Sequence, residues 1–151
     1  MILFLDTSAL VKLYVIEDGS EQTHQAALQA EILAVSRIAW AEYHAALARR
    51  ARIAPEDEPL LDQARSALAS DWEKFFVVEV SQAVVERAGE HAELYALRAY
   101  DAVQLATASY LADQSRQTVQ FACFDRRLNK AATAQGMKPV PRNCRKASSR
   151  T

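Results

Sequence analysis

Residues 2–10 read Ile2-Leu3-Phe4-Leu5-Asp6-Thr7-Ser8-Ala9-Leu10, and this stretch decides the fold. The run from Ile2 to Leu5 is too short for a helix and has no polar alternation, which is typical of a parallel strand buried on both faces. Asp6 ends the run, and the residues from Ser8 to about Ile16 have the spacing of a short helix. No basic segment precedes the apolar residues, so the stretch lacks the pattern of a signal peptide.

The same order of strand and helix recurs along the chain. Short apolar runs predict further strands at residues 32–35, 75–80, 118–124 and 138–140. The predicted helices begin after or at Ser20, Ser36, Pro59, Ser81, Tyr100 and Arg126, with the three serines as N-caps and Gly136 after the last helix. Alternating strands and helices predict a three-layer α/β/α fold, with a central, mostly parallel sheet of four or five strands.

Length and composition indicate one domain. The chain has 151 residues, of which 50% are hydrophobic and 25% charged. We expect a single domain with one core over residues 1–141, followed by a flexible basic tail at 142–151. No apolar stretch approaches the roughly 18 residues of a membrane helix. Together with the unpaired thiols, this favours a cytoplasmic protein without membrane contact.

Composition also excludes several kinds of site. The three glycines are too far apart for a dinucleotide-binding or P-loop phosphate motif. The cysteines and histidines lack the spacing of a zinc site, so we expect the histidines to be structural or surface residues. The formal net charge is −1, and nucleic-acid binding would therefore depend on local basic clusters. Carboxylates remain as the groups that carry chemistry.

Four carboxylates are predicted to meet at one edge of the sheet. Asp6 and Asp125 follow predicted strands, and Asp101 lies in the first turn of a predicted helix. Strand C-termini and the following helix N-termini share one edge of an open parallel sheet, where ligands bind. Glu42 is six residues beyond Ser36, about 9 Å into its helix, and a glutamate leaning toward the N-terminus would reach that edge. Its helical neighbours are apolar, so it is expected to be partly buried.

Each acid also has an ordinary structural interpretation. Asp6 and Asp125 are placed to cap the helices that follow them, Asp101 would interact favourably with its helix dipole, and Glu42 could pair with an arginine of its own helix. Four carboxylates at one edge would, however, raise one another's pKa unless a cation lay among them. Mg²⁺ or Mn²⁺ is the expected cofactor because both ions prefer oxygen ligands.

Four segments of the chain carry a family resemblance. They are Asp6-Thr7-Ser8-Ala9-Leu10, Trp40-Ala41-Glu42-Tyr43, Leu97-Arg98-Ala99-Tyr100-Asp101-Ala102-Val103-Gln104-Leu105-Ala106 and Phe124-Asp125-Arg126-Arg127-Leu128. In order and spacing they resemble the acidic motifs of PIN domains, and within that family the VapC-type toxins of toxin–antitoxin pairs. The resemblance runs from Ile2 to about Pro139, and all four acidic positions are kept. Gln104 stands where relatives often carry other polar residues.

The resemblance implies an activity and its partners. It implies that the metal-binding and catalytic acids of a ribonuclease toxin are Asp6, Glu42, Asp101 and Asp125. Thr7 or Ser8 would support them by hydrogen bonding, and one or two divalent ions would assist hydrolysis of RNA phosphodiesters. It also favours a homodimer and a small cognate antitoxin. Apolar residues beyond one narrow stripe, among them Leu10, Leu13, Tyr14 and Leu28, permit such surfaces but are more often ordinary core.

Local positive charge is expected to hold the RNA. The candidate phosphate contacts are Arg37, Arg126, Arg127 and Lys130, all near the predicted site edge. The alternative is that Arg127 and Lys130 belong to a solvated helix face and that Arg126 neutralises an acid. Trp40, Tyr43 and Tyr100 could stack on bases, although aromatic residues at helical spacing are more often core.

Three other functions compete with the nuclease hypothesis. A haloacid dehalogenase-type phosphatase would need an aspartate at position 8, which is Ser8. A response-regulator receiver would need an acid at the end of the third strand and a lysine after a later one, and neither is convincingly present. The stronger alternative is a non-catalytic PIN-like module that binds RNA or protein, although such a module would have no need for four mutually repelling acids.

Overall fold

The structure, a computed structural model that describes residues 1–140, is built around one parallel sheet. Its strands run in the order β3-β2-β1-β4-β5. Their bounds are β1 Ile2–Leu5, β2 Ile32–Ser36, β3 Phe76–Val78, β4 Val119–Ala122 and β5 Lys138–Pro139. All four pairings are parallel, which confirms the predicted sheet.

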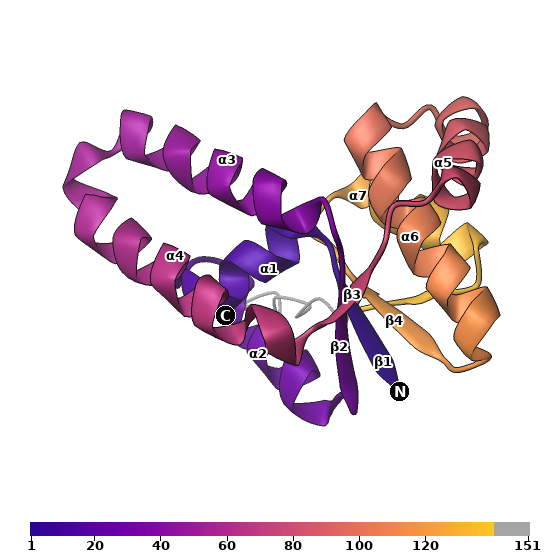
Figure 1. Ribbon diagram of the computed structural model, residues 1–151, viewed down its shortest axis with the longest axis horizontal. Coiled ribbons are helices and arrows are strands. Elements are labelled where there is room, and N and C mark those ends of the chain that lie inside the picture. The colour runs from indigo at the N-terminus through magenta and orange to yellow at the C-terminus, as the bar shows by residue number, and fades with distance from the viewer. Residues whose placement is uncertain (141–151) are drawn as a thin grey trace, which may run out of the picture.

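Helices cover both faces of the sheet. Their bounds are α1 Thr7–Tyr14, α2 Ser20–Gln29, α3 Ala39–Ile53, α4 Glu58–Asp71, α5 Gln82–Tyr95, α6 Ala99–Ser115 and α7 Arg126–Ala134. Short 3₁₀ turns, Pro55–Asp57 and Trp72–Lys74, flank α4. Helices α1 to α4 lie on one side of the sheet and α5 to α7 on the other (Figure 1). The three-layer α/β/α expectation is confirmed.

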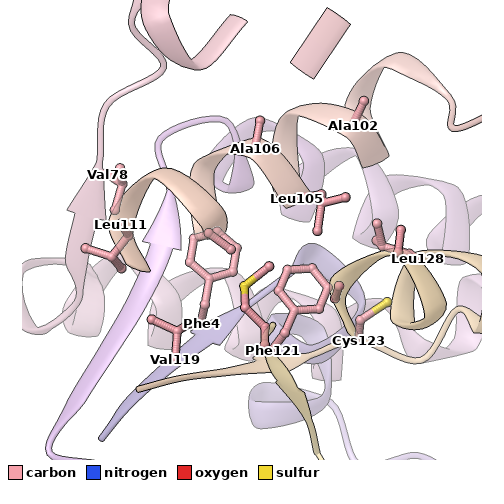
Figure 2. Close-up of a cluster of buried hydrophobic side chains, with 14 of the residues drawn as sticks. Phe4, Val78, Ala102, Leu105, Ala106, Leu111, Val119, Phe121, Cys123 and Leu128 are labelled. Atoms are coloured by element: carbon pink, nitrogen blue, oxygen red, sulfur yellow. The ribbon is translucent and has the colours of Figure 1, made fainter. Parts of the chain in front are cut away.

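Strand β1 lies at the centre of the sheet, and every one of its residues is apolar and buried. Phe4 and Phe121 are paired across β1 and β4, and their rings stack 5.7 Å apart beneath α6 (Figure 2). Leu3 and Leu5 alternate to the other face and pack with residues of α1, α3 and α4. The buried side chains therefore form two clusters separated by the sheet, where the sequence predicted one core.

Two predicted helix caps are wrong. Gly19, at φ +92°, caps α2, while the Ser20 hydroxyl donates to the Val15 carbonyl inside the helix start. Ser36 is buried at the end of β2, and α3 begins later, after Ile38. A serine before a helix has the chemistry of a cap, but the geometry of the turn decides which residue stands at the cap position. Ser81 does cap α5, with its hydroxyl accepting from the Val84 amide.

The chain changes direction across the sheet next to β1. It runs outward from β1 to β2 and β3, and then returns to place β4 on the other side of β1. Ligands of open α/β sheets bind outside the carboxyl ends of the strands at such a point. The predicted tail at 142–151 lies outside the described residues. No helix within residues 1–140 has both the length and the apolarity to cross a bilayer.

Candidate active site

The carboxyl ends of β1 and β4 open into a hollow of about 320 Å³. Its lining residues are Asp6, Thr7, Ser8, Glu42, Asp101, Gln104, Phe124 and Asp125. The structure thus brings together all four acids and both hydroxyl residues that the sequence singled out. They come from four elements far apart in the chain: the start of α1, the first turn of α3, the first turn of α6 and the start of α7.

Asp6 is the most buried of the four acids, with 6% of its surface exposed. Its Oδ1 accepts hydrogen bonds from the Ser8 hydroxyl at 2.6 Å and the Ala9 amide at 3.0 Å, so it also caps α1. Burial raises the pKa of Asp6, against the hydrogen bonds of Ser8, Ala9 and the Cys123 thiol; Asp101 raises it further. The Ser8 hydroxyl also accepts from the Phe124 amide at 3.4 Å, which joins the end of β1 to the segment after β4.

Glu42 lies in the first turn of α3, closer to the helix start than the sequence suggested. Because α3 begins after Ile38 and not at Ser36, the carboxylate needs no long reach to the sheet edge. The Gln104 amide donates to Glu42 Oε1 at 2.8 Å and to the Thr7 hydroxyl at 3.1 Å. Burial raises the pKa of Glu42, hydrogen bonds from Gln104 and Thr7 lower it, and the charges of Asp6 and Asp101 raise it.

Asp101 and Asp125 are the other two acids that line the hollow. Burial raises the pKa of Asp101, the charge of Asp125 raises it further, and Arg98 opposes both. Asp125 is exposed and caps α7, with its Oδ1 accepting from the Leu128 amide at 2.8 Å. The capping interpretation of Asp6 and Asp125 is therefore correct, yet it does not remove either carboxylate from the hollow. Each caps through one oxygen, Oδ1.

The hollow has the donor chemistry of a site for a hard cation. Among residues 1–140, its lining includes four carboxylates and no lysine or arginine. Within residues 1–140, no three His, Cys, Asp or Glu side chains are close enough, as they stand, to hold a metal ion. Mg²⁺ commonly keeps several waters and needs only one or two protein carboxylates, so the residues present fit such an ion. Within the part of the chain that the structure describes, the buried Gln104 Oε1 has no hydrogen-bond partner.

The predicted RNA contacts separate into two groups. Arg37 is paired with Glu79 on the exposed side of the β2 and β3 ends and does not line the hollow. Arg126 and Arg127 line a neighbouring hollow that shares Asp101 and Asp125 with the first. Lys130 is exposed on α7 and lines neither hollow.

The aromatic candidates differ in accessibility. Tyr43 is fully buried and donates its hydroxyl to the Ala64 carbonyl, so it is a core residue and cannot stack on a base. Trp40 is 37% exposed and packs on Trp72, whereas Tyr100 is 66% exposed at the start of α6.

Sequence reasoning assigned no role to Gln104 or Arg98. Gln104 is 2% exposed in an otherwise apolar stretch of α6, and a lone amide in such a stretch was the available signal. Arg98 precedes α6 as its N-cap residue and lines the neighbouring hollow. Its position three residues before Asp101 placed it at the same sheet edge.

This chain is similar to known proteins in both sequence and fold. A PIN domain family model matches residues 3–134. Ribonuclease VapC45 of Mycobacterium tuberculosis (strain CDC 1551 / Oshkosh) is 34% identical over 144 residues, which cover 93% of this chain and 95% of the relative.

Two solved structures share the fold. VapBC2 from Rickettsia felis, bound to a DNA fragment from their promoter, has a TM-score of 0.59 at 14% identity and covers 92% of this chain and 97% of that one. A toxin–antitoxin complex from Klebsiella pneumoniae has a TM-score of 0.53 at 23% identity, with coverage of 82% and 86%. The family model spans all four acids of the hollow.

Proposed function

The chain belongs to the PIN domain family, and from this premise we propose that it is a metal-dependent endoribonuclease, the toxin of a toxin–antitoxin pair. The observation that carries the proposal is the gathering of Asp6, Glu42, Asp101 and Asp125 around one hollow at the ends of β1 and β4. Burial together with carboxylate repulsion raises the pKa of Asp6, Glu42 and Asp101, which is the situation that a bound cation relieves.

The relatives support the choice of substrate. The relative with 34% identity over 93% of this chain is named a ribonuclease. A phosphodiester in RNA is then the bond to be hydrolysed, and we place residues 1–141 in a single nuclease domain.

The four acids would hold one or two Mg²⁺ or Mn²⁺ ions, which when bound supply charge neutralisation at the phosphate and an activated water. The chain's own residues set the geometry. Ser8 and the Ala9 amide hold the Asp6 carboxylate in place, and Gln104 holds Glu42. Pre-positioned carboxylates avoid the cost of reorganisation when the substrate arrives.

Protein partners are supported by exposed apolar side chains away from the acids. Leu10 is core, but Ile16 is 89% exposed and Leu28 87% exposed. A further hollow of about 370 Å³ lies between the end of α1 and α4, lined mainly by apolar residues, Ile16 and Leu60 among them. Such patches are typical of protein interaction sites. We therefore propose a small antitoxin, a homodimer, and a cytoplasmic location.

The alternative is a PIN-like module that binds RNA or protein without cutting it. The repelling acids weigh against it, because replacing them would relieve a cost that binding alone does not require.

The test is cleavage of mixed cellular RNA by the purified chain in EDTA, Mg²⁺ or Mn²⁺, beside Asp101→Asn prepared identically. We expect discrete fragments that need a divalent ion and are absent from the variant. Equal fragment patterns for both proteins, or none from folded and antitoxin-free protein on any RNA, would favour the binding module.

A further inference from the structure

A second hollow, of about 500 Å³, adjoins the acid hollow. Its lining residues are Leu97, Arg98, Asp101, Asp125, Arg126 and Arg127. Asp101 and Asp125 line both hollows and therefore stand at the boundary between them. The first is acidic, whereas the second contains three guanidinium groups against two carboxylates. A ligand that spans both would meet a cation-binding region and then an anion-binding region.

Among the described residues, none of the three arginines of this second hollow forms an ion pair. Arg50 and Arg87 do form ion pairs, whereas Arg49, Arg52 and Arg116 form none within residues 1–140, so it is their place in the hollow that distinguishes these three. Arg127 donates to the Ala96 carbonyl at 3.3 Å and keeps its charge. Free guanidinium groups in a hollow have donor geometry that matches phosphate oxygens.

One helix N-terminus, that of α6, adds to the positive potential of the same hollow, because the start of α7 is already capped by the Asp125 carboxylate. Arg98 is the N-cap residue of α6, and Asp125 is the N-cap residue of α7. The start of α6 has no side-chain cap hydrogen bond, which leaves its first backbone amides without a capping acceptor. Unfilled amides and the helix dipole both favour an anion at this position. The arginines and the bare helix start thus point independently to the same ligand chemistry.

We propose that Arg98, Arg126 and the start of α6 form a subsite for the RNA phosphate next to the one that is cut. This inference rests on the proposed ribonuclease function, which places the scissile phosphate at the acids. Because Asp101 and Asp125 separate the hollows, the adjoining phosphate of the same strand is the anion that reaches the arginines. Phosphate contacts fix the register of a nucleic acid without reading its sequence. Arg98 is accordingly a positioning residue for the substrate.

The first experiment measures binding of a fluorescent single-stranded RNA by anisotropy, in Mg²⁺, with every protein carrying Glu42→Gln so that the RNA stays intact. Arg98→Gln is compared with Arg116→Gln, which replaces an exposed arginine that follows the other end of α6 and has no ion pair with any described residue. The helix has 17 residues, which separates the two positions by about 25 Å. Both replaced side chains are exposed, so both variants are expected to fold, as melting curves would verify.

We expect Arg98→Gln to weaken RNA binding about tenfold and to reduce the slope of log K against log salt by about 0.7, the loss of one phosphate contact on a single strand. Arg116→Gln should match the parent. Equal affinity and equal salt slope for the two variants would overturn the subsite.

The second experiment measures cleavage without Glu42→Gln. Loss of a substrate-binding contact should raise KM for Arg98→Gln by about tenfold with little change in kcat, whereas Asp101→Asn should lose kcat. If the wild type cuts RNA and Arg98→Gln has an unchanged KM, the nuclease proposal stands and the subsite proposal fails. If no RNA is cut, the nuclease proposal fails, and the binding experiment alone decides whether Arg98 holds a phosphate.

Discussion

At the scale of single residues, Gln104 shows how one amide can organise two carboxylate-bearing segments. It is buried in α6, and its two amide hydrogens reach Glu42 on α3 and Thr7 on α1. Without it, the Glu42 carboxylate would lose the hydrogen bond that does most to lower its pKa against the effect of burial. Groups that orient ligand residues commonly matter almost as much as the ligand residues themselves.

Gln104→Leu should therefore reduce kcat for RNA cleavage by about 10–100-fold, because Glu42 is no longer held. The matched control is Thr107→Val, which removes a buried hydroxyl one turn further along α6 that bonds Val103 and Ser36 and not the acids. The measurement is kcat and KM for both variants at equal folded concentration. A Gln104→Leu enzyme no slower than Thr107→Val would exclude a role in holding Glu42.

Asp125 carries two functions, which two substitutions can separate. Its Oδ1 caps α7, and its charge faces the hollow. Asparagine caps helices about as well as aspartate, whereas alanine at an N-cap costs about 1 kcal/mol. We expect both Asp125→Asn and Asp125→Ala to lose cleavage, and only Asp125→Ala to lower the free energy of unfolding, measured in urea. Retained cleavage in Asp125→Asn would show that capping is the whole role of this residue.

At the scale of elements, α3 and α4 form a hairpin that projects beyond the sheet (Figure 1). The Tyr43 hydroxyl joins the two helices by donating to the Ala64 carbonyl at 2.8 Å, and the Tyr14 hydroxyl joins α1 to Asp71 at the end of α4. Burial raises the pKa of both tyrosines, so both remain donors throughout the neutral range. The Tyr43 bond holds the two helices of the hairpin together, and the Tyr14 bond ties the hairpin, and with it Glu42, to the rest of the domain.

Tyr43→Phe should consequently lower the free energy of unfolding by about 1 kcal/mol, the usual net contribution of one buried hydrogen bond. The ring still fills its place, so no cavity is formed and secondary structure by circular dichroism should stay the same. Tyr100→Phe is a suitable comparison, because Tyr100 is 66% exposed and its hydroxyl makes no hydrogen bond within residues 1–140. If the two variants unfold at the same urea concentration, the Tyr43 bond contributes nothing.

At the scale of the whole molecule, the acid hollow costs stability at neutral pH. The pKa of Asp101 is raised above 3.8, chiefly by burial. A carboxyl with a raised pKa in the folded state contributes stability that is present below its unfolded pKa and is lost as pH rises through the folded value. Asp6 and Glu42 act in the same direction.

Asp101→Asn should then be more stable than wild type at pH 7 without divalent ions, by about 1 kcal/mol, or about 2–4 °C in melting temperature. The gain should shrink as pH falls through the raised folded pKa and vanish below 3.8, where the wild-type carboxyl is protonated in both states. Asp113→Asn, which removes an exposed carboxylate of the same helix paired with Arg87, should show no gain. Calorimetry across this pH range tests the prediction, and a gain that grows toward low pH would contradict it.

Divalent ions should stabilise the same molecule. Binding to the folded state alone adds about 1.4 kcal/mol at ten times the dissociation constant, so Mg²⁺ should raise the wild-type melting temperature by about 3–6 °C. Asp101→Asn should respond less. Identical shifts in both proteins would mean that the ion binds elsewhere.

The sequence by itself determined the local features of this protein. The apolar run of β1, the alternation of strands and helices and the acids at strand and helix ends are properties of short segments, and each was readable because side-chain periodicity depends only on near neighbours in the chain. The family resemblance extended this reading to the four acids as one set.

Only the tertiary structure decided what lies beside those acids. The bond from Gln104 to Thr7 spans 97 residues, and that from Ser8 to Phe124 spans 116. The pairing of Arg37 with Glu79, and the lack of an ion pair at Arg98 within residues 1–140, depend on strand order, which no local pattern encodes. The physical reason is that strand order and helix packing are set by the burial of apolar surface over the whole chain, so partners distant in sequence are fixed only when the complete fold forms.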